Sequence, residues 1–535
     1  MVQKIWKYIF LIMCVGLLTG CTPETDVKEE DSTSKVEVPV EEETPKKESV
    51  SKITIGMQNP VTLNPIYNMD KSVQHTLYLL FDTLVNIEED GSVTPNLAES
   101  FTYSAKDKVL IVRLREDIQW QDVTPLTSED VLFTLDMIKN ATESPYKLTT
   151  ANIANVQAMD RYTFKIFYRQ DFSGVYQTLF FPVLPKHIYN VEKEQQLSLL
   201  PIGNGPYMYK ESVPHKEITL EANPNYFKGE PAIKNIEVMI IPDEESLLYA
   251  FEQGLIDVIY TDVMEWGKYA KDKSATIYEI GTNCYEFMGL NFNKPIFQNA
   301  KVREALVYGI DRQKISDTYY LGHSVVTDTL IAPYSYLFDP TLQIKEYNME
   351  KAKLLLVGEG YQYDETSKLF TKNNVPLSFN LLVNEENKER LRVAEYMQKM
   401  YKELGIEVNI DKVSAEVYKE RIYNKQFDAF LGGWKISYIP DVTFAFHSSQ
   451  IANGDNFISY SDPMMDDLIR NAFNSHPDQI TEAYGRLQQY IAEQNPYISL
   501  YFKNGALITK KKIGGNIQPD PINFYSNIEE WKLID

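Results

Sequence analysis

Histidine and cysteine, the residue types that most often bind metals or act as nucleophiles, are few and scattered in this sequence. The six histidines show no HExxH or other metal-binding spacing. They are His75, His187, His215, His323, His447 and His476. The chain has no G-x-S-x-G nucleophile elbow and no P-loop lysine, and Cys284 lacks a local catalytic signature, as expected of a buried, inert thiol. Carboxylates are numerous, but nothing singles out a glycosidase-like pair. The sequence therefore predicts no enzyme, no metal site and no cofactor.

A binding surface is better supported, by the stretch QFDAFLGGWKISYIPD at residues 426–441. Its apolar residues Phe427, Ala429, Phe430 and Leu431 predict a buried strand. The strand then meets Gly432 and Gly433, where another backbone can approach closely. Trp434 follows, a large flat side chain with one N–H to place. Small residues, an aromatic ring and a carboxylate at the end of a buried strand suit the lining of a ligand cleft. The alternative is a core strand, a glycine bend and a packed tryptophan.

Cys21 is the cysteine with an expected covalent role. Lys4 and Lys7 precede an apolar run at residues 8–18 that has the length of a signal peptide core. Leu18-Thr19-Gly20-Cys21 resembles the bacterial lipobox, in which the cysteine becomes the lipidated first residue of the mature protein. The resemblance implies a signal peptide at residues 1–20 and a lipid anchor on the outer face of a membrane, with the folded part in solution. The alternative is an ordinary cleaved signal with an incidental cysteine.

The segment after Cys21 differs in composition from the rest of the chain. Residues 22–50 contain ten acidic and four basic residues and no aromatic residue, so they cannot bury enough apolar surface to fold. We expect residues 21–51 to be a disordered tether. The net charge of −22 argues against nucleic acid and acidic lipid as partners. The three cysteines leave Cys284 without a partner, so no intramolecular disulfide is expected.

Several helices and strands that would position these residues can be predicted. Folded sequence begins near Lys52 with a strand, followed by a turn at Asn64-Pro65 and a helix over residues 73–84. Thr127 and Asp130 predict a capped helix start, and Asp243 and Gly254 bracket another helix. Asn384 is expected to cap a long helix that ends at Gly405. From residue 348 to residue 502, helices and strands alternate, which indicates an α/β lobe.

Seven blocks in consecutive order carry a specific resemblance. They are PNLAESF, LREDIQWQDVTPLTSEDVLFTL, PIGNGPYMYK, AFEQGLIDVIYTD, MGLNFNKP, KVREALVYGIDRQKI and QYIAEQNPYISLYF. Together they resemble the family 5 extracellular solute-binding proteins, the peptide-, nickel- and sugar-binding components of ABC importers. The resemblance covers residues 52–535. One departure is Val123, where the family usually has glycine after the aspartate.

The resemblance implies an α/β fold of two lobes, of the periplasmic-binding-protein type (class II, cluster C), joined by two chain crossings. The first crossing is expected near residues 284–291 and the second near residues 495–502. Lobe one would comprise residues 52–290 and 498–535, with an inserted subdomain at about 92–200, and lobe two residues 291–497. Ligand would be enclosed by hinge closure of the lobes.

By resemblance, ligand lies extended between the lobes and pairs with protein backbone, which gives affinity without reading side chains. The implied ligand-binding residues are Asn64, Tyr67, Lys71, Gly432, Gly433, Trp434, Ser437, Tyr438, Asp441, Tyr501 and Phe502. For Asn64 the alternative is simple turn chemistry, and for Tyr501 and Phe502 it is strand packing.

Ser437 is a second departure from part of the family, because well-known peptide binders carry at this position an aspartate that pairs with the ligand α-ammonium. A hydroxyl cannot neutralise a buried ammonium, so we expect N-terminally blocked or internal peptide segments to be tolerated. Asp441 is the nearest carboxylate that could take over this pairing, or it merely caps the following segment.

The implied function is a peptide-binding lipoprotein that acts as a monomer and delivers ligand to the permease and ATPase of an ABC importer, on the extracellular face of the membrane or the periplasmic side. Two alternatives remain. The same fold can bind another solute, such as a sugar, a nickel chelate or a haem, or it can serve as a surface receptor without transport.

Overall fold

The large mixed sheet of this protein is built from segments far apart in the sequence. The computed structural model describes residues 51–263, 266–437 and 441–534. The predicted leader, Cys21, the predicted tether up to residue 50, and Tyr438 lie outside these ranges. The expected first strand is confirmed as β1 (Lys52–Met57).

The large sheet has 11 strands. In order across the sheet they are β18 (Glu407–Val413), β17 (Ser378–Asn384), β19 (Ala429–Lys435), β12 (Ala275–Leu290), β20 (Tyr497–Lys510), β11 (Val258–Thr261), β1, β10 (Asn235–Ile240), β9 (Glu217–Ala222) and β8 (Tyr207–Val213), with β13 (Ser324–Val326) paired to β20. We call the part built on β1 and β8–β11 the first lobe and the part built on β17–β19 the second lobe.

Four small sheets accompany the large one. They are β4 (Ala98–Ser104), β5 (Val109–Leu114), β7 (Thr163–Tyr168) and β6 (Ile153–Ala158); β2 (Val85–Ile87) and β3 (Val93–Pro95); β14 (Gln362–Asp364), β15 (Leu369–Lys372) and β16 (Val375–Pro376); and β21 (Ile513–Gly515) and β22 (Trp531–Leu533). The four-stranded sheet shares its buried core with the first lobe.

The α-helices flank these sheets. In the first lobe they are α1 (Lys71–Leu77), α2 (Ser128–Asn140), α3 (Lys186–Tyr189), α4 (Lys193–Gln196) and α5 (Glu244–Glu252). After β12 they are α6 (Pro295–Gln298), α7 (Ala300–Tyr308), α8 (Arg312–Tyr319), α9 (Met349–Gly358), α10 (Lys388–Leu404), α11 (Ala415–Tyr423), α12 (Thr443–Phe446), α13 (Pro463–Phe473) and α14 (Ile480–Gln494). The alternation of helices and strands expected from residue 348 onward is present.

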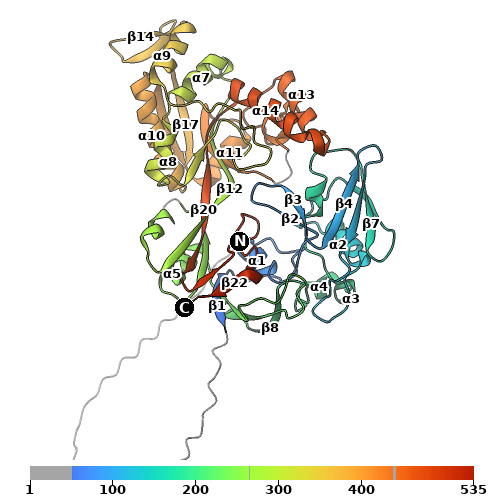
Figure 1. Ribbon diagram of the computed structural model, residues 1–535. Coiled ribbons are helices and arrows are strands. Elements are labelled where there is room, and N and C mark those ends of the chain that lie inside the picture. Colours follow the sequence, from blue (N-terminus) through green and yellow to red (C-terminus); the bar gives the residue numbers. More distant parts are fainter. Residues whose placement is uncertain (1–50, 264–265, 438–440, 535) are drawn as a thin grey trace, which may run out of the picture. The chain divides into compact units, whose positions relative to one another are not determined.

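Two long strands are common to both lobes. Figure 1 shows β12 and β20 running side by side from one lobe to the other. They pair antiparallel from Ala275↔Lys510 to Gly289↔Tyr497, with register shifts between Gly281 and Tyr285 and between Glu286 and Phe287. Cys284 lies in this region and is half-buried, not fully buried as expected. The boundaries predicted for the lobes and for the inserted subdomain stay predictions.

Local capping explains where several helices begin and end. The backbone N–H of Thr127 donates to the Asp130 carboxylate at 2.9 Å, and both halves of the predicted capping box are present. Helix α1 ends at Leu77, earlier than predicted. The carbonyls of Leu79 and Leu80 cannot continue the helix, because they accept hydrogen bonds from the backbone N–H groups of Tyr207 and Gly205, respectively.

Val123 adopts a backbone conformation that glycine favours. Its φ is 64°, and its side chain is exposed. A β-branched residue is strained in this region, so the chain keeps a turn that suits the glycine usual in the resembling family.

Candidate functional site

The Gly432-Gly433-Trp434 segment lies within strand β19. The sequence instead suggested a strand that ends before these three residues. The strand runs from Ala429 to Lys435, and Gly432 and Gly433 pair with Phe287 and Glu286 of β12. On its other side, β19 pairs with β17 only at Ala429 and Phe430. Among the described residues, no strand therefore pairs with that side of β19 from Gly432 to Lys435, and we call this backbone stretch the open edge.

The glycine at 433 makes room for an ion pair. A Cβ atom there would lie 2.4 Å from Nη2 of Arg390 and 2.5 Å from Oε1 of Glu286. These two side chains form two hydrogen bonds, Nε–H to Oε2 at 2.8 Å and Nη2–H to Oε1 at 2.9 Å. Burial lowers the pKa of Arg390, but the charge and hydrogen bonds of Glu286 more than offset this, so its pKa is raised.

Trp434 lies in an aromatic cluster beside the open edge. Its Nε1–H donates to the Tyr497 hydroxyl at 3.4 Å. Its ring is stacked with Phe457 at 5.9 Å and meets Phe444 edge-on at 5.0 Å. The side chain remains half-buried, so one part of the indole is held while another part stays accessible.

The two polar residues after Trp434 differ in their surroundings. Ser437 is exposed, whereas Asp441 is half-buried and its Oδ1 accepts a hydrogen bond from the backbone N–H of Thr443 at 2.8 Å. This is the capping geometry considered as the alternative for Asp441. Tyr438 lies outside the described residues.

The first-lobe candidates do not gather at one point. Asn64 is buried, and its Oδ1 accepts from the N–H of Ile66 at 2.9 Å, which is turn chemistry. The Tyr67 hydroxyl donates to Gln196 at 3.2 Å. The ammonium of Lys71 lies over the ring of Tyr260 at 4.6 Å and over that of Phe524 at 5.0 Å.

Tyr501 and Phe502 are in the core of β20, with exposed fractions of 1% and 0%. The Tyr501 hydroxyl is 3.1 Å from that of Tyr320, and the Phe502 ring is 5.2 Å from Tyr285. This is the packing considered as the alternative for both residues, and a contact of either with ligand stays a prediction.

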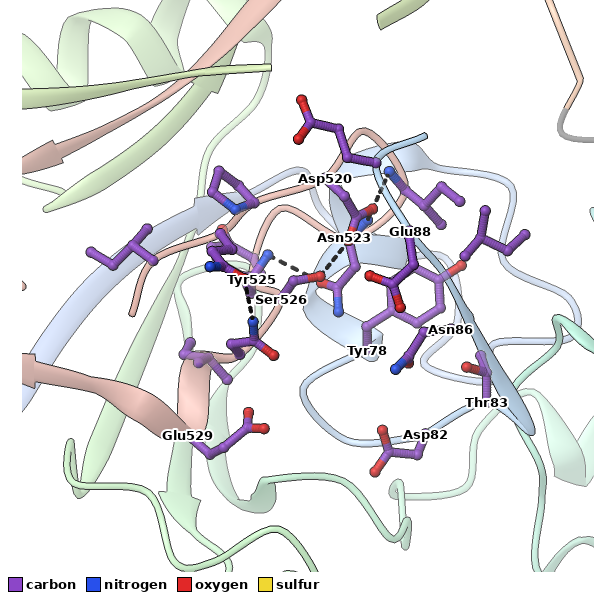
Figure 2. Close-up of a pocket in the computed structure, with 18 of the residues that line it drawn as sticks. Tyr78, Asp82, Thr83, Asn86, Glu88, Asp520, Asn523, Tyr525, Ser526 and Glu529 are labelled. Carbon is purple, nitrogen blue, oxygen red and sulfur yellow. Dashed lines mark hydrogen bonds between the residues drawn. The ribbon is translucent and has the colours of Figure 1, made fainter. Parts of the chain in front are cut away.

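The first lobe also contains a cavity of about 930 Å³ that the sequence did not indicate. Its walls come from the end of α1, from β2 and the loop after it, from β12, and from the C-terminal segment 517–529, with Tyr334 reaching it from the loop after β13. Figure 2 shows Asp82, Glu88, Asp520 and Glu529 arranged around this space.

Negative charge dominates the cavity lining. Six of its carboxylates, which we call the cavity carboxylates, are Asp82, Glu88, Glu89, Asp90, Asp520 and Glu529. None of them forms an ion pair with any residue in the described ranges. A seventh, Glu279, lies 3.1 Å from Nδ1 of His323, and Lys228 is the basic residue of the lining.

Burial shifts three of the cavity carboxylates toward the neutral form. It raises the pKa of Asp520 to about 6, against hydrogen bonds from Ser526, Asn523 and Ile522 that lower it. It also raises the pKa of Asp82 and of Glu529, each opposed by the charge of Lys228. The cavity therefore holds negative charge that the protein itself compensates poorly.

A smaller hollow of about 50 Å³ shares lining residues with this cavity and is also lined by residues that follow β19. It is lined by Ser437 and Asp441 from the second lobe and by Glu89 and Asp90 from the first, and it shares Tyr334 with the large cavity. The two lobes touch here, since the N–H of Tyr336 donates to the carbonyl of Asp90 at 2.9 Å. Burial lowers the pKa of His75 in α1, and the charges of Lys71 and Lys435 lower it further, so the end of β19 lies within electrostatic reach of α1.

No group of three or more His, Cys, Asp or Glu side chains in the described part of the chain is arranged to hold a metal ion. Within the same ranges, no helix is both long and apolar enough to cross a membrane. Sequence reasoning missed the cavity carboxylates; the signal available was the acidic run Glu88-Glu89-Asp90, which directly follows β2.

Comparisons with known proteins agree along most of the chain. Residues 92–456 match the model of the bacterial extracellular solute-binding proteins, family 5. The chain is 28% identical over 494 residues to the oligopeptide-binding protein AppA of Bacillus subtilis, covering 89% of this chain and 90% of AppA. It is 25% identical over 504 residues to the nickel-binding periplasmic protein of Escherichia coli, covering 90% of this chain and 93% of that protein.

Solved structures agree as well. The structure of Bacillus subtilis AppA in complex with a nonapeptide matches with a TM-score of 0.65 at 27% identity, covering 90% of this chain and 99% of AppA. The α/β two-lobe fold expected from the sequence is thereby confirmed.

Proposed function

The chain belongs to family 5 of the bacterial extracellular solute-binding proteins, and from this premise we propose that it binds peptides between its two lobes and delivers them to the permease and ATPase of an ABC importer. It acts as a monomeric carrier and not as an enzyme. The similarity to an oligopeptide-binding protein over 89% of the chain supports peptides as the solute.

One structural observation carries the proposal, namely the open edge of β19. An extended peptide can pair with those N–H and C=O groups between Gly432 and Lys435 that point away from β12, in the way that a strand extends a sheet. Backbone pairing accepts many sequences, which suits a carrier. Asn64, Tyr67, Lys71, Ser437, Tyr438, Asp441, Tyr501 and Phe502 remain the further proposed ligand-binding residues.

Mass spectrometry of small molecules released from natively purified, denatured protein tests the proposal. We expect peptides. Titration with one of those peptides should change tryptophan emission and reduce the radius of gyration, because closure covers Trp434. Trp434→Phe is the control, since Trp120, Trp266 and Trp531 also emit. A released sugar, haem or chelate with no bound peptide would refute the proposal.

The same titration examines the ligand N-terminus. Because Ser437 is a neutral hydroxyl and Asp441 caps the following segment, a free peptide and its N-acetylated form should bind with similar affinity. A loss of about 3 kcal/mol on acetylation would reveal a dedicated carboxylate, and Asp441→Asn would identify Asp441 as that group if it caused the same loss.

A nickel chelate is the second candidate solute, because the chain is also similar to a nickel-binding periplasmic protein. The absence of a metal-ligating group within the described residues gives it no structural support. Isothermal titration with Ni²⁺ and histidine would detect it.

We further propose that Cys21 carries the lipid that anchors the protein at the extracellular face of the membrane, as in Gram-positive bacteria, or on the periplasmic side in a Gram-negative cell. Cys21→Ala should abolish labelling by a fatty-acid probe and release the protein or leave its signal uncleaved. Equal labelling of variant and wild type would refute the anchor.

A further inference from the structure

The large cavity carries a charge imbalance that the fold does not resolve. The cavity carboxylates come from three separate segments, at residues 82, 88–90 and 520–529, and converge on one space of about 930 Å³. Against them stands Lys228, which forms no ion pair within 4.0 Å with any described acidic residue. Clustered carboxylates repel one another, and burial away from water strengthens that repulsion.

A second, independent observation comes from Asp82. Its Oδ1 accepts from Asn96 at 3.1 Å, whereas its Oδ2 is shielded from solvent and has, among the described residues, only the Tyr226 hydroxyl nearby, which lowers the pKa of Asp82 but forms no hydrogen bond of standard geometry with Oδ2. A buried carboxylate oxygen without a well-placed donor is costly. Since Asp82 lines the cavity, a donor entering that space can reach it.

Asp520 is held in place for such a donor. Its Oδ1 accepts from the backbone N–H groups of Ile522 and Asn523, both at 2.7 Å, and its Oδ2 accepts from the Ser526 hydroxyl. These donors fix the direction of the carboxylate, and a fixed group loses less conformational freedom on binding.

We propose that the acidic cavity receives a positively charged side chain of the solute, so that the protein selects peptides that contain lysine or arginine. The inference rests on the proposed function, because it assumes a peptide on the open edge of β19. It goes beyond that function by assigning a separate subsite and a charge preference.

The residues that line both hollows support this arrangement. The small hollow at Ser437, which follows the open edge, is lined by Glu89 and Asp90, and these two residues also line the large cavity. Lysine and arginine have long, flexible stems, and their donors form short, strong hydrogen bonds with carboxylates. A peptide lying along β19 can thus direct such a side chain past Tyr334 into the cavity.

A lysine scan tests the proposal on the whole ligand-free protein. Five alanine pentapeptides carry one lysine at successive positions, and five matched peptides carry Nε-acetyllysine, which removes the charge but keeps the aliphatic stem of lysine. Calorimetry should show that lysine binds at least about tenfold more tightly than acetyllysine at one position or more. The preference should weaken as salt is raised.

Variants of the cavity carboxylates locate the source of the preference for lysine over acetyllysine. Asp82→Asn should reduce it to about threefold or less, and Glu88→Gln serves as a second variant because Glu88 is exposed and its loss does not threaten folding. Glu365→Gln is the matched control, since it removes one charge from an exposed carboxylate paired with Lys368 in the turn after β14. It should leave the preference unchanged.

The outcomes separate this inference from the proposed function. If peptides bind and lysine shows no advantage at any position, the charge preference is wrong and peptide binding stands. If Asp82→Asn and Glu88→Gln both leave the preference intact, the cavity is not its source. If no peptide binds, both proposals fail. Calcium binding at one equivalent without a lysine preference would show a metal site instead.

Discussion

Two groups of charged side chains in this protein are treated in opposite ways. In the second lobe, Arg312 and Asp328 are each 2% exposed and lie 2.6 Å apart, and Glu286 forms its two hydrogen bonds with Arg390. In the first lobe, the cavity carboxylates have no ion pairs. The paired charges complete their hydrogen bonds within the fold, whereas the unpaired ones face a space large enough for a ligand group.

The difference teaches which charges serve the fold and which are available for binding. Arg312 also donates to the carbonyls of Thr327 and Ser499, at 2.7 and 2.9 Å, so it ties three segments together. Removing one partner of such a pair leaves the other charge unpaired in the low-dielectric interior of the protein. Removing one cavity carboxylate should instead relieve repulsion in the ligand-free protein.

Arg312→Met tests the first half of the comparison and should have the largest effect. We expect the free energy of unfolding to fall by about 3–5 kcal/mol, because Asp328 is left buried with only the ammonium of Lys345 among the described residues, 3.9 Å away, to compensate its charge. Urea denaturation followed by circular dichroism measures it. Arg486→Met is the control, since Arg486 forms an exposed pair with Glu482 on α14, and it should cost less than about 1 kcal/mol. Equal losses would refute the distinction.

Gly433→Ala tests the pair beside the open edge. The new Cβ must displace Arg390 or Glu286, so we expect a loss of about 1–3 kcal/mol in the free energy of unfolding and weaker peptide binding. Gly358→Ala, at the end of α9 with open space around it, should be neutral or stabilising by up to about 1 kcal/mol. An unaltered melting temperature for Gly433→Ala would contradict the role of this pair.

Asp520→Asn tests the other half of the comparison through pH. Because burial raises the pKa of Asp520 from 3.8 to about 6, the folded state binds its proton more tightly than the unfolded state. This contribution to stability is present below about pH 4 and is lost as pH rises to about 6. The variant should therefore gain about 1–2 kcal/mol relative to wild type between pH 4 and pH 7.5.

Chemical denaturation of the ligand-free proteins at pH 4, 5, 6 and 7.5 measures this difference. The charge of Glu88 also raises the pKa of Asp520, so Glu88→Gln should shift the transition to lower pH. If wild type and Asp520→Asn show parallel pH profiles, Asp520 is ionised throughout and the cavity already compensates its charge.

Local signals predicted part of this structure well. Asp243 caps α5 through Ser246, and Gly405 ends α10 with a φ of 94°. The start of α10 was predicted three residues early, since Asn387 and not Asn384 accepts the N–H of Arg390. Asn384 is still the last residue of β17, and its side chain stabilises the turn between the two elements.

The candidate site was predicted less completely, for a physical reason. The segment around Trp434 is continuous, so its residue types and order were visible in the sequence. The cavity carboxylates belong to segments more than 400 residues apart, such as Asp82 and Asp520. Only the fold brings these carboxylates together. In a chain with a net charge of −22, a single acidic residue is not a distinctive signal of a binding site.

The paired strands β12 and β20 have a mechanical consequence. Two strands hydrogen bonded along their length form a ribbon, which bends readily across its flat face but resists sliding of one strand past the other. A motion that separates the lobes would therefore bend this ribbon, with flexure concentrated between Gly281 and Phe287, where the pairing register shifts twice.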